Sequence, residues 1–209
     1  MNIFIYGDSN TWGQIPNING YSKDAVIKQY PKEQIWWYPL TKEHSVFVNG
    51  LPGRAIANDN PWLSGRNASL TIENDLYGIN PELVIIQLGT NDCKSRYGLS
   101  ASDITNQLKI FTDFIKEKTN AMIMIISPAI IKEGNKITDK FYKGAEQKSK
   151  ELDKTYKKLA MSNGYIFISG VTCPVGEDGE HLTLYGHKLL SQKIVAEFEK
   201  INANQNEKI

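Results

Sequence analysis

Five short apolar segments recur along the chain, and each has the length of a strand. They are rich in Ile, Val or Phe and end at Gly, Asn or Ser, as buried strands do. Three of the five are continuous rather than alternating, which is typical of a parallel sheet covered on both faces. The segments are residues 3–6, 45–49, 83–88, 121–126 and 165–168.

Helical patterns lie between these segments. Ile104, Leu108, Phe111 and Ile115 are spaced four, three and four residues apart and share one helix face, with Ser102 as the candidate N-cap.

Two more helices are predicted, over residues 139–163, with Gly164 after the last turn, and over residues 184–201. The aromatic stretch 14–38 is interpreted as a loop followed by a helix. Alternating strands and helices predict an α/β fold, a doubly wound three-layer α/β/α sandwich around a five-stranded parallel sheet.

Length and charge narrow the classes of function. We expect a single domain over residues 1–202 and a polar C-terminal tail over 203–209. With 24 Lys and Arg against 23 Asp and Glu, the net charge is +1. This balance lacks the excess positive charge of a nucleic-acid-binding protein, so no nucleic-acid partner is expected.

The cysteines and the longest apolar runs bear on location. Cys93 and Cys173 are too few for a disulfide framework and too far apart for a zinc finger, so free thiols are expected. The apolar runs are too short for a transmembrane helix. Residues 1–6 lack the basic region and apolar length of a signal peptide, which predicts a cytoplasmic protein.

Candidate chemistry follows the predicted strands. In an open α/β sheet, ligands bind outside the carboxyl ends of the strands. Ser9 follows the first strand, and its backbone N–H lies near a helix N-terminus that favours developing negative charge. Asn91, after the third strand, can donate from its side-chain NH₂. His181 can accept the proton of the serine, and Asp178 can orient the imidazole.

Four segments together resemble the sequence blocks of the SGNH/GDSL hydrolase superfamily, in the same order along the chain. They are Gly7-Asp8-Ser9, the loop 49–54, Gly89-Thr90-Asn91-Asp92, and Asp178 with His181. Each block is weak alone, and their combination is specific.

This resemblance implies a flavodoxin-like SGNH hydrolase fold without a cofactor or metal. It implies that Ser9 is the nucleophile, His181 the base and Asp178 the orienting acid. The oxyanion hole would be formed by the Ser9 N–H, the Gly53 N–H and the Asn91 side chain. Gly50 competes with Gly53, because family members often have Thr or Ser soon after the donor glycine, and Ala55 stands there in this chain.

Within the superfamily, Thr11-Trp12-Gly13 and the segment 144–148 resemble the arylesterase and acyltransferase branch. This similarity implies that Trp12 lines a tight acyl pocket suited to short acyl groups such as acetyl. Oligomers are common in that branch, which points to a homo-oligomer.

The leading hypothesis is a serine esterase that hydrolyses short-chain carboxylic esters through an acyl-serine intermediate, with acyl transfer to an alcohol as a further activity. A carbohydrate O-acetyl esterase and a small lysophospholipase or thioesterase stay open beside it. A metal-dependent phosphoesterase would use Asp8, Asp92, Asp178 and His181 as ligands. A flavodoxin-like binding module would cradle phosphate in the first loop, although that loop has no lysine.

Several conspicuous residues have simpler roles in this interpretation. Asp8 and Asp92 are expected to hold their loops through hydrogen bonds. His187 is expected to pack or to face solvent rather than to react. The remaining tryptophans are divided between core packing and a substrate wall; they are Trp36, Trp37 and Trp62.

Overall fold

The computed structural model describes residues 1–20, 22 and 26–206. All five predicted strands are present in this part of the chain, and they form one parallel sheet with the order β2-β1-β3-β4-β5. Their bounds are β1 Asn2–Gly7, β2 Ser45–Gly50, β3 Leu83–Gln87, β4 Met122–Ile126 and β5 Ile166–Ile168. Gly7 pairs with Gly50 on one side and with Gln87 on the other, so the first three strands end level.

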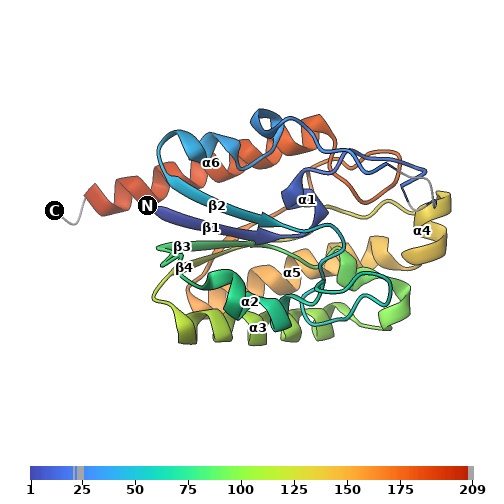
Figure 1. The fold of residues 1–209 in the computed structure, drawn as a ribbon, viewed down its shortest axis with the longest axis horizontal. Coiled ribbons are helices and arrows are strands. Elements are labelled where there is room, and N and C mark those ends of the chain that lie inside the picture. Colours follow the sequence, from blue (N-terminus) through green and yellow to red (C-terminus); the bar gives the residue numbers. More distant parts are fainter. Residues whose placement is uncertain (21, 23–25, 207–209) are drawn as a thin grey trace.

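Helices cover both faces of the sheet (Figure 1). One face packs against α2 (Ala68–Leu76), α3 (Ala101–Lys118) and α5 (Ala145–Asn163). The other packs against α6 (Leu184–Asn206) and against the segment 35–40, which follows the 3₁₀ turn Lys32–Gln34 and runs into the 3₁₀ turn Tyr38–Lys42. The predicted three-layer α/β architecture is therefore confirmed.

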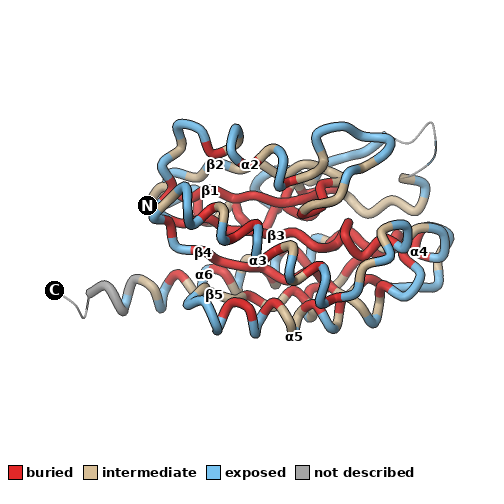
Figure 2. The backbone as a smooth tube through the Cα atoms, turned by 90° about the horizontal axis from the view of Figure 1, so that it is seen from below, coloured by how far each residue is buried: buried red, intermediate tan, exposed pale blue. Residues whose placement is uncertain are grey.

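The central strands β1, β3 and β4 are apolar at nearly every position because the core lies on both sides of them, whereas no residue of the edge strand β2 is buried. In β1, Phe4 and Tyr6 contact the α2–α3–α5 layer, whereas Ile3 and Ile5 contact the α6 layer. Figure 2 shows buried positions along β1, β3 and β4 and exposed positions on the outer helices. No helix in the described ranges is long and apolar enough to cross a membrane.

Three details of the helix prediction were wrong. The N-cap of α3 is Ser100 rather than Ser102, because Ser100 and Asp103 exchange hydrogen bonds in a capping box. The predicted helix 139–163 is two helices, α4 (Lys136–Phe141) and α5, separated where Gly144 adopts a left-handed conformation with φ +81°. α6 continues past the predicted start of the tail to Asn206.

Two further differences concern regions of weak pattern. α2 was not predicted, because only Ala68, Ile72 and Leu76 are buried along it. In the stretch 14–38, the structure has a loop and a 3₁₀ turn where a helix was expected; residues 21 and 23–25 lie outside the described part.

Candidate active site

Ser9 lies at the first turn after β1. Asp8 caps the four-residue helix α1 (Ser9–Trp12), and its Oδ1 accepts the N–H of Asn10 at 2.9 Å. The predicted role of Asp8 in holding this turn is confirmed. Gly7 is required here, because a Cβ at this position would lie 2.0 Å from the Thr11 hydroxyl. The tight turn brings the Ser9 hydroxyl to the carboxyl edge of the sheet.

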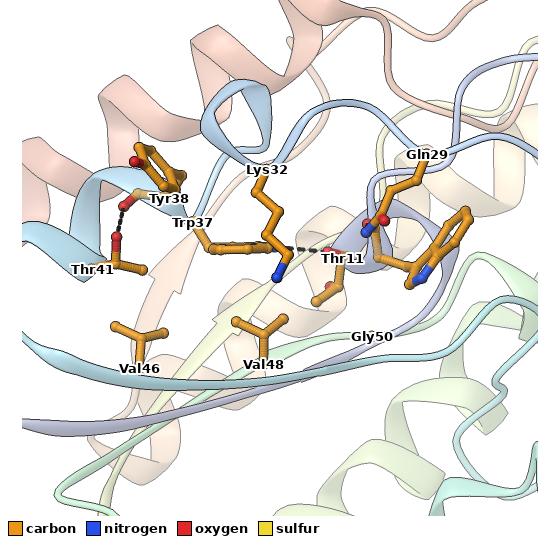
Figure 3. A pocket seen from close by; sticks show the side chains of 10 residues that line it. Thr11, Gln29, Lys32, Trp37, Tyr38, Thr41, Val46, Val48 and Gly50 are labelled. Atoms are coloured by element: carbon orange, nitrogen blue, oxygen red, sulfur yellow. Dashed lines mark hydrogen bonds between the residues drawn. The ribbon is translucent and has the colours of Figure 1, made fainter.

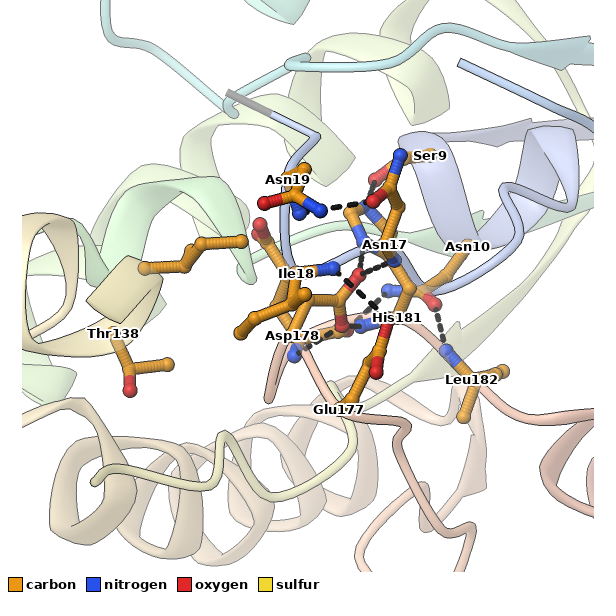
Figure 4. A network of polar contacts seen from close by, with 12 residues as sticks. Ser9, Asn10, Asn17, Ile18, Asn19, Thr138, Glu177, Asp178, His181 and Leu182 are labelled. Carbon is orange, nitrogen blue, oxygen red and sulfur yellow. Dashed lines mark hydrogen bonds and ion pairs between the residues drawn. The ribbon is translucent and has the colours of Figure 1, made fainter. Parts of the chain in front are cut away.

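The structure brings together the three residues predicted as a triad (Figure 4). Nε2 of His181 lies 2.9 Å from Oγ of Ser9, and Nδ1 of His181 lies 2.8 Å from Oδ2 of Asp178. All three side chains are buried. The line of hydrogen bonds therefore runs from a hydroxyl through an imidazole to a carboxylate, which can move a proton from Ser9 to His181.

Asp178 is held as an acceptor from several sides. Its Oδ1 accepts the backbone N–H groups of Glu180 and His181, at 3.2 and 3.1 Å, and its Oδ2 also accepts the N–H of Asn17 at 2.7 Å. Burial by itself raises the pKa of Asp178, but the bond from His181 and these N–H groups outweigh burial and hold the pKa below its ordinary value. The carboxylate is thereby kept ionised beside the imidazole.

His181 has the opposite shift. Burial by itself lowers the pKa of His181, but the negative charges of Glu180, Asp178 and Asp8 outweigh burial and raise the pKa above its ordinary value. A raised pKa makes the imidazole a stronger base and stabilises the imidazolium that forms when it takes a proton.

The predicted oxyanion donors share one cavity with Ser9 and His181. A cavity of about 730 Å³ is lined by Ser9, Gly53, Asn91 and His181 among the described residues. The backbone carbonyl of Arg54 accepts from Nδ2 of Asn91 at 3.0 Å, which places the amide beside the loop of Gly53. Donors from three separate segments thus border the same space as the hydroxyl.

Gly50 and Gly53 differ in their surroundings. Gly50 packs against α1, where an added Cβ would lie 2.4 Å from the backbone nitrogen of Trp12, and it lines another cavity. Gly53 has φ +83° and lines the cavity of Ser9. Of the two glycines, Gly53 is the one that borders the cavity of Ser9.

A model of the GDSL-like lipase/acylhydrolase family matches residues 3–194. The chain belongs to this family. It is therefore a GDSL-type acylhydrolase, a carboxylic ester hydrolase. None of the curated proteins compared with the chain matches it.

Solved structures of esterases have the same fold as this acylhydrolase. The aryl esterase of M. smegmatis has a TM-score of 0.84 at 24% identity, with 96% of this chain and 98% of that chain covered. Est24, a carbohydrate acetylesterase from Sinorhizobium meliloti, has a TM-score of 0.80 at 26% identity, with coverage of 93% and 98%. Axe2, an acetylxylan esterase from Geobacillus stearothermophilus, has a TM-score of 0.65 at 13% identity, with coverage of 93% and 92%.

Trp12 lines a different cavity from Ser9. This second cavity, of about 410 Å³, is lined by Thr11, Trp37 and Val48 (Figure 3). Trp12 also lines it and is not among the residues that line the cavity of Ser9. The reason is the packing of α1 on β2: Gly50 lies against the Trp12 backbone, and Trp37 Nε1 donates to the Thr11 carbonyl at 2.8 Å. The role of Trp12 in the substrate pocket stays a prediction, and the structure places this residue at the second cavity.

The other tryptophans are now assigned. Trp36 and Trp37 are buried in the core beside α6, whereas Trp62 is 70% exposed and lines the cavity of Ser9. Trp62, not Trp12, is the tryptophan that faces the site of this acylhydrolase.

Two asparagines that the sequence analysis did not single out join α1 and the N-terminal loop to the loop of the triad. Asn10 donates from Nδ2 to the Glu180 carbonyl at 3.1 Å and accepts the N–H of Leu182 at 2.8 Å. Asn17 binds Asp178, as described above. Their only sequence signal is closeness to Ser9, because the contacts span more than 150 residues of chain.

Arg54 was also missed, although it follows Gly53 directly. Its guanidinium lies 4.0 Å from the centre of the Tyr6 ring and donates to the carbonyls of Gly7 and Asn49, at 3.0 and 2.6 Å. These bonds hold the loop of Gly53 and Arg54 against the end of β1. Burial lowers the pKa of Arg54 from its ordinary high value.

Two charged residues inside the cavity were missed as well. Lys94 and Glu180 are both buried, and both line the cavity of Ser9. Lys94 donates to Oδ1 of Asn91 at 2.8 Å, and the Tyr142 hydroxyl donates to the Glu180 carboxylate. Lys94 follows the predicted block 89–92, and Glu180 lies between Asp178 and His181. This closeness to the predicted blocks is the sequence signal that could have identified them.

The remaining candidates have structural roles. Asp92 accepts the N–H of Ile56 and Nδ2 of Asn58, both at 2.9 Å, and so supports its loop as predicted. Cys93 and Cys173 are free and buried, and burial raises the pKa of both thiols. His187 is fully buried and packs edge-on against Tyr30. Within the described ranges, no group of three or more His, Cys, Asp or Glu is placed to hold a metal ion.

Proposed function

We propose that the chain is a serine esterase that hydrolyses short-chain, acetyl-like carboxylic esters through an acyl-serine intermediate. The observation that carries this proposal is the line of hydrogen bonds from Ser9 through His181 to Asp178, at the wall of a cavity that Gly53 and Asn91 also line.

In the acylation step, Oγ of Ser9 attacks the ester carbonyl while Nε2 of His181 takes the hydroxyl proton. The negative oxygen of the tetrahedral intermediate accepts from the N–H of Ser9, the N–H of Gly53 and Nδ2 of Asn91. Asp178 stabilises the imidazolium, which then protonates the departing alcohol. The acyl group stays on Ser9.

In the deacylation step, water gives a proton to Nε2 of His181 and attacks the acyl-serine carbonyl. The same donors bind the second oxyanion, and collapse of the intermediate returns the proton to Oγ of Ser9. An alcohol that replaces water gives acyl transfer in place of hydrolysis. Hydrolysis and acyl transfer use the same residues, so whether water or an alcohol occupies the cavity decides between them.

The acyl half and the alcohol half of the proposed substrate are supported by different observations. The short acyl group is supported by the similarity to a carbohydrate acetylesterase at 26% identity. The alcohol half is supported by the cavity wall, which exposed Trp62 lines together with the polar residues Gln14 and Asn60. The Arg96 guanidinium lies 4.8 Å from the centre of the Trp62 ring, and the ring is still 70% exposed. A sugar has an apolar face that stacks on an aromatic ring and a rim of hydroxyls that hydrogen-bond. Trp62 therefore favours a carbohydrate O-acetyl esterase as the second, narrower candidate.

The first experiment measures hydrolysis of nitrophenyl acetate, butyrate and octanoate by the purified protein, with and without a chelator. We expect the acetate to react fastest and the chelator to have no effect. Ser9→Ala should lose the activity and also lose labelling by a fluorophosphonate. A Ser9→Ala variant with full activity would overturn the proposal.

The second experiment tests the sugar candidate with glucose pentaacetate. Trp62→Ala should raise KM for the acetylated sugar several-fold and leave hydrolysis of nitrophenyl acetate nearly unchanged. The matched control is Tyr77→Ala, which removes an aromatic side chain that is 91% exposed and lies outside the cavity of Ser9. An unchanged KM for the sugar in Trp62→Ala would reject the carbohydrate candidate while leaving the esterase proposal intact.

A further inference from the structure

Lys94 is a buried cation beside the amide proposed as an oxyanion donor. Its side chain is 4% exposed, and its Nζ donates to Oδ1 of Asn91 at 2.8 Å. A buried ammonium is costly unless it is paired and hydrogen-bonded, so a lysine retained here has specific partners.

The Asn91 amide is held at both ends. Oδ1 accepts from Lys94, while Nδ2 donates to the Arg54 carbonyl at 3.0 Å. Rotating the amide by half a turn would place its NH₂ against the ammonium and its oxygen against a carbonyl, and both contacts would be repulsive. A side-chain NH₂ has two hydrogens, so one N–H is left for a substrate oxygen. Without Lys94, the Arg54 carbonyl would be the one remaining partner of the Asn91 side chain among the described residues.

Lys94 also polarises the amide. A cation at the carbonyl end draws electron density from the nitrogen and makes the remaining N–H a stronger donor. An oxyanion donor acts through preorganisation, because it already points at the charge before the charge develops. Holding the amide still and polarising it both favour the transition state over the ground state.

Glu180 supplies a nearby counter-charge. It is 2% exposed, its carboxylate accepts the Tyr142 hydroxyl, and its backbone carbonyl accepts Nδ2 of Asn10. Burial lowers the pKa of Lys94, and the negative charge of Glu180 is the largest influence that opposes this. Glu180 also directly precedes His181 in the sequence. Its negative charge therefore acts both on His181 and on Lys94, which donates to Asn91.

We propose that Lys94 is a positioning residue of the oxyanion hole, which acts through Asn91 and contributes to turnover rather than to substrate affinity. The inference rests on the proposed function, because it requires that Asn91 donates to the oxyanion.

The test is a double-mutant cycle on nitrophenyl acetate hydrolysis with Lys94→Met, Asn91→Ala and the double variant. Removal of one oxyanion donor costs about 100- to 1000-fold in kcat, and we expect Asn91→Ala to fall in that range. Lys94→Met should lower kcat by about 10-fold or more with KM unchanged within about two-fold. In the Asn91→Ala background, the same Lys94 substitution should have almost no further effect, because its target is gone.

Three results would overturn the inference: wild-type kcat in Lys94→Met, an effect confined to KM, or an equal loss from Lys94→Met with and without Asn91. The last result would mean that Lys94 acts independently of the amide. If Asn91→Ala itself keeps full activity, the proposed oxyanion role of Asn91 fails instead, so the two failures are distinguishable.

Lys94→Met removes a buried positive charge near Glu180, so folding is checked by thermal unfolding. The variant Lys94→Met with Glu180→Gln removes one positive and one negative charge together and leaves the net charge unchanged. Measured at a pH well above the His181 transition, it should show the same loss in kcat as Lys94→Met. Wild-type kcat in this folded double variant would overturn the inference equally.

Discussion

The backbone N–H of Asn17 donates to Oδ2 of Asp178 at 2.7 Å, on the same oxygen that lies 2.8 Å from Nδ1 of His181. The loop after Ser9 therefore helps to orient Asp178, the proposed acid, beside His181, the proposed base, although Asn17 and Asp178 lie 161 residues apart. Because an N–H group can only donate, it selects the ionised, accepting form of Asp178. The geometry of the proposed triad thus depends on contact between two segments that are far apart in the sequence.

Asp178→Asn should impair turnover far more than binding. The amide has no negative charge to stabilise the imidazolium, and its NH₂ cannot accept from Asn17 or His181. We expect kcat for nitrophenyl acetate to fall by about 10²- to 10⁴-fold with a small change in KM. The control is Glu177→Gln, since Glu177 lies in the same loop and accepts the N–H of Ile18 at the surface. Comparable losses in both variants would argue against a specific role for Asp178.

Esterase activity should rise with pH as His181 loses its proton, because only the neutral imidazole can take the proton of Ser9. Glu180 favours the protonated form and raises the His181 pKa, so the rise should be centred above 6.5, the ordinary value. Glu180→Gln should move the midpoint of kcat/KM to lower pH, and Glu177→Gln should leave it in place. A midpoint that stays or moves upward in Glu180→Gln would contradict this assignment.

His187 should make the fold sensitive to acid. Burial is the main cause that lowers its pKa to about 4, with a smaller contribution from the charge of His181. Because the folded pKa lies below the unfolded value of 6.5, the neutral ring stabilises the fold above about pH 6.5, and this contribution is lost as the pH falls toward 4. The loss amounts to about 3 kcal/mol at pH 4.

His187→Leu removes this titration and also the two ring nitrogens that have no hydrogen-bond partner among the described residues. Urea unfolding of both proteins from pH 4 to 8 measures the difference. The stability of the variant relative to wild type should increase steadily as the pH decreases below 6.5. A difference independent of pH would show that His187 is not held neutral.

The two glycines of the second loop should respond differently to alanine. In Gly50→Ala, the new Cβ would lie 2.4 Å from the Trp12 nitrogen, so α1 and Ser9 must shift, and both Tm and kcat should fall strongly. In Gly53→Ala, the nearest atoms lie at 3.4 Å and the cost is the left-handed φ of +83°, about 1 to 2 kcal/mol, while the backbone N–H is retained. Thermal unfolding and hydrolysis of nitrophenyl acetate measure both effects. Equal losses in the two variants would contradict this distinction.

The strands and the order of the functional segments were predictable from sequence because they depend on local composition. A strand buried on both faces must be apolar along its length, and ligand sites in parallel sheets lie beyond the carboxyl ends of strands. Ser9, Asn91, Asp178 and His181 all follow from these two rules together with the family resemblance. The N-cap of α3 and the break before α5 were less predictable, because single residues such as Ser100 and Gly144 decide them.

The sequence by itself therefore determined the α/β sheet, the segments at its edge and the chemical types available there. Tertiary structure alone decided which neighbours those groups have. It placed Trp12 against β2, and it placed Trp62 and Gly53, rather than Gly50, at the cavity of Ser9. It also placed the Lys94 ammonium on Asn91 and the Asn17 N–H on Asp178. The physical reason is that hydrogen bonds and charges act over a few ångströms, and residues far apart in sequence reach that separation only when the sheet has assembled.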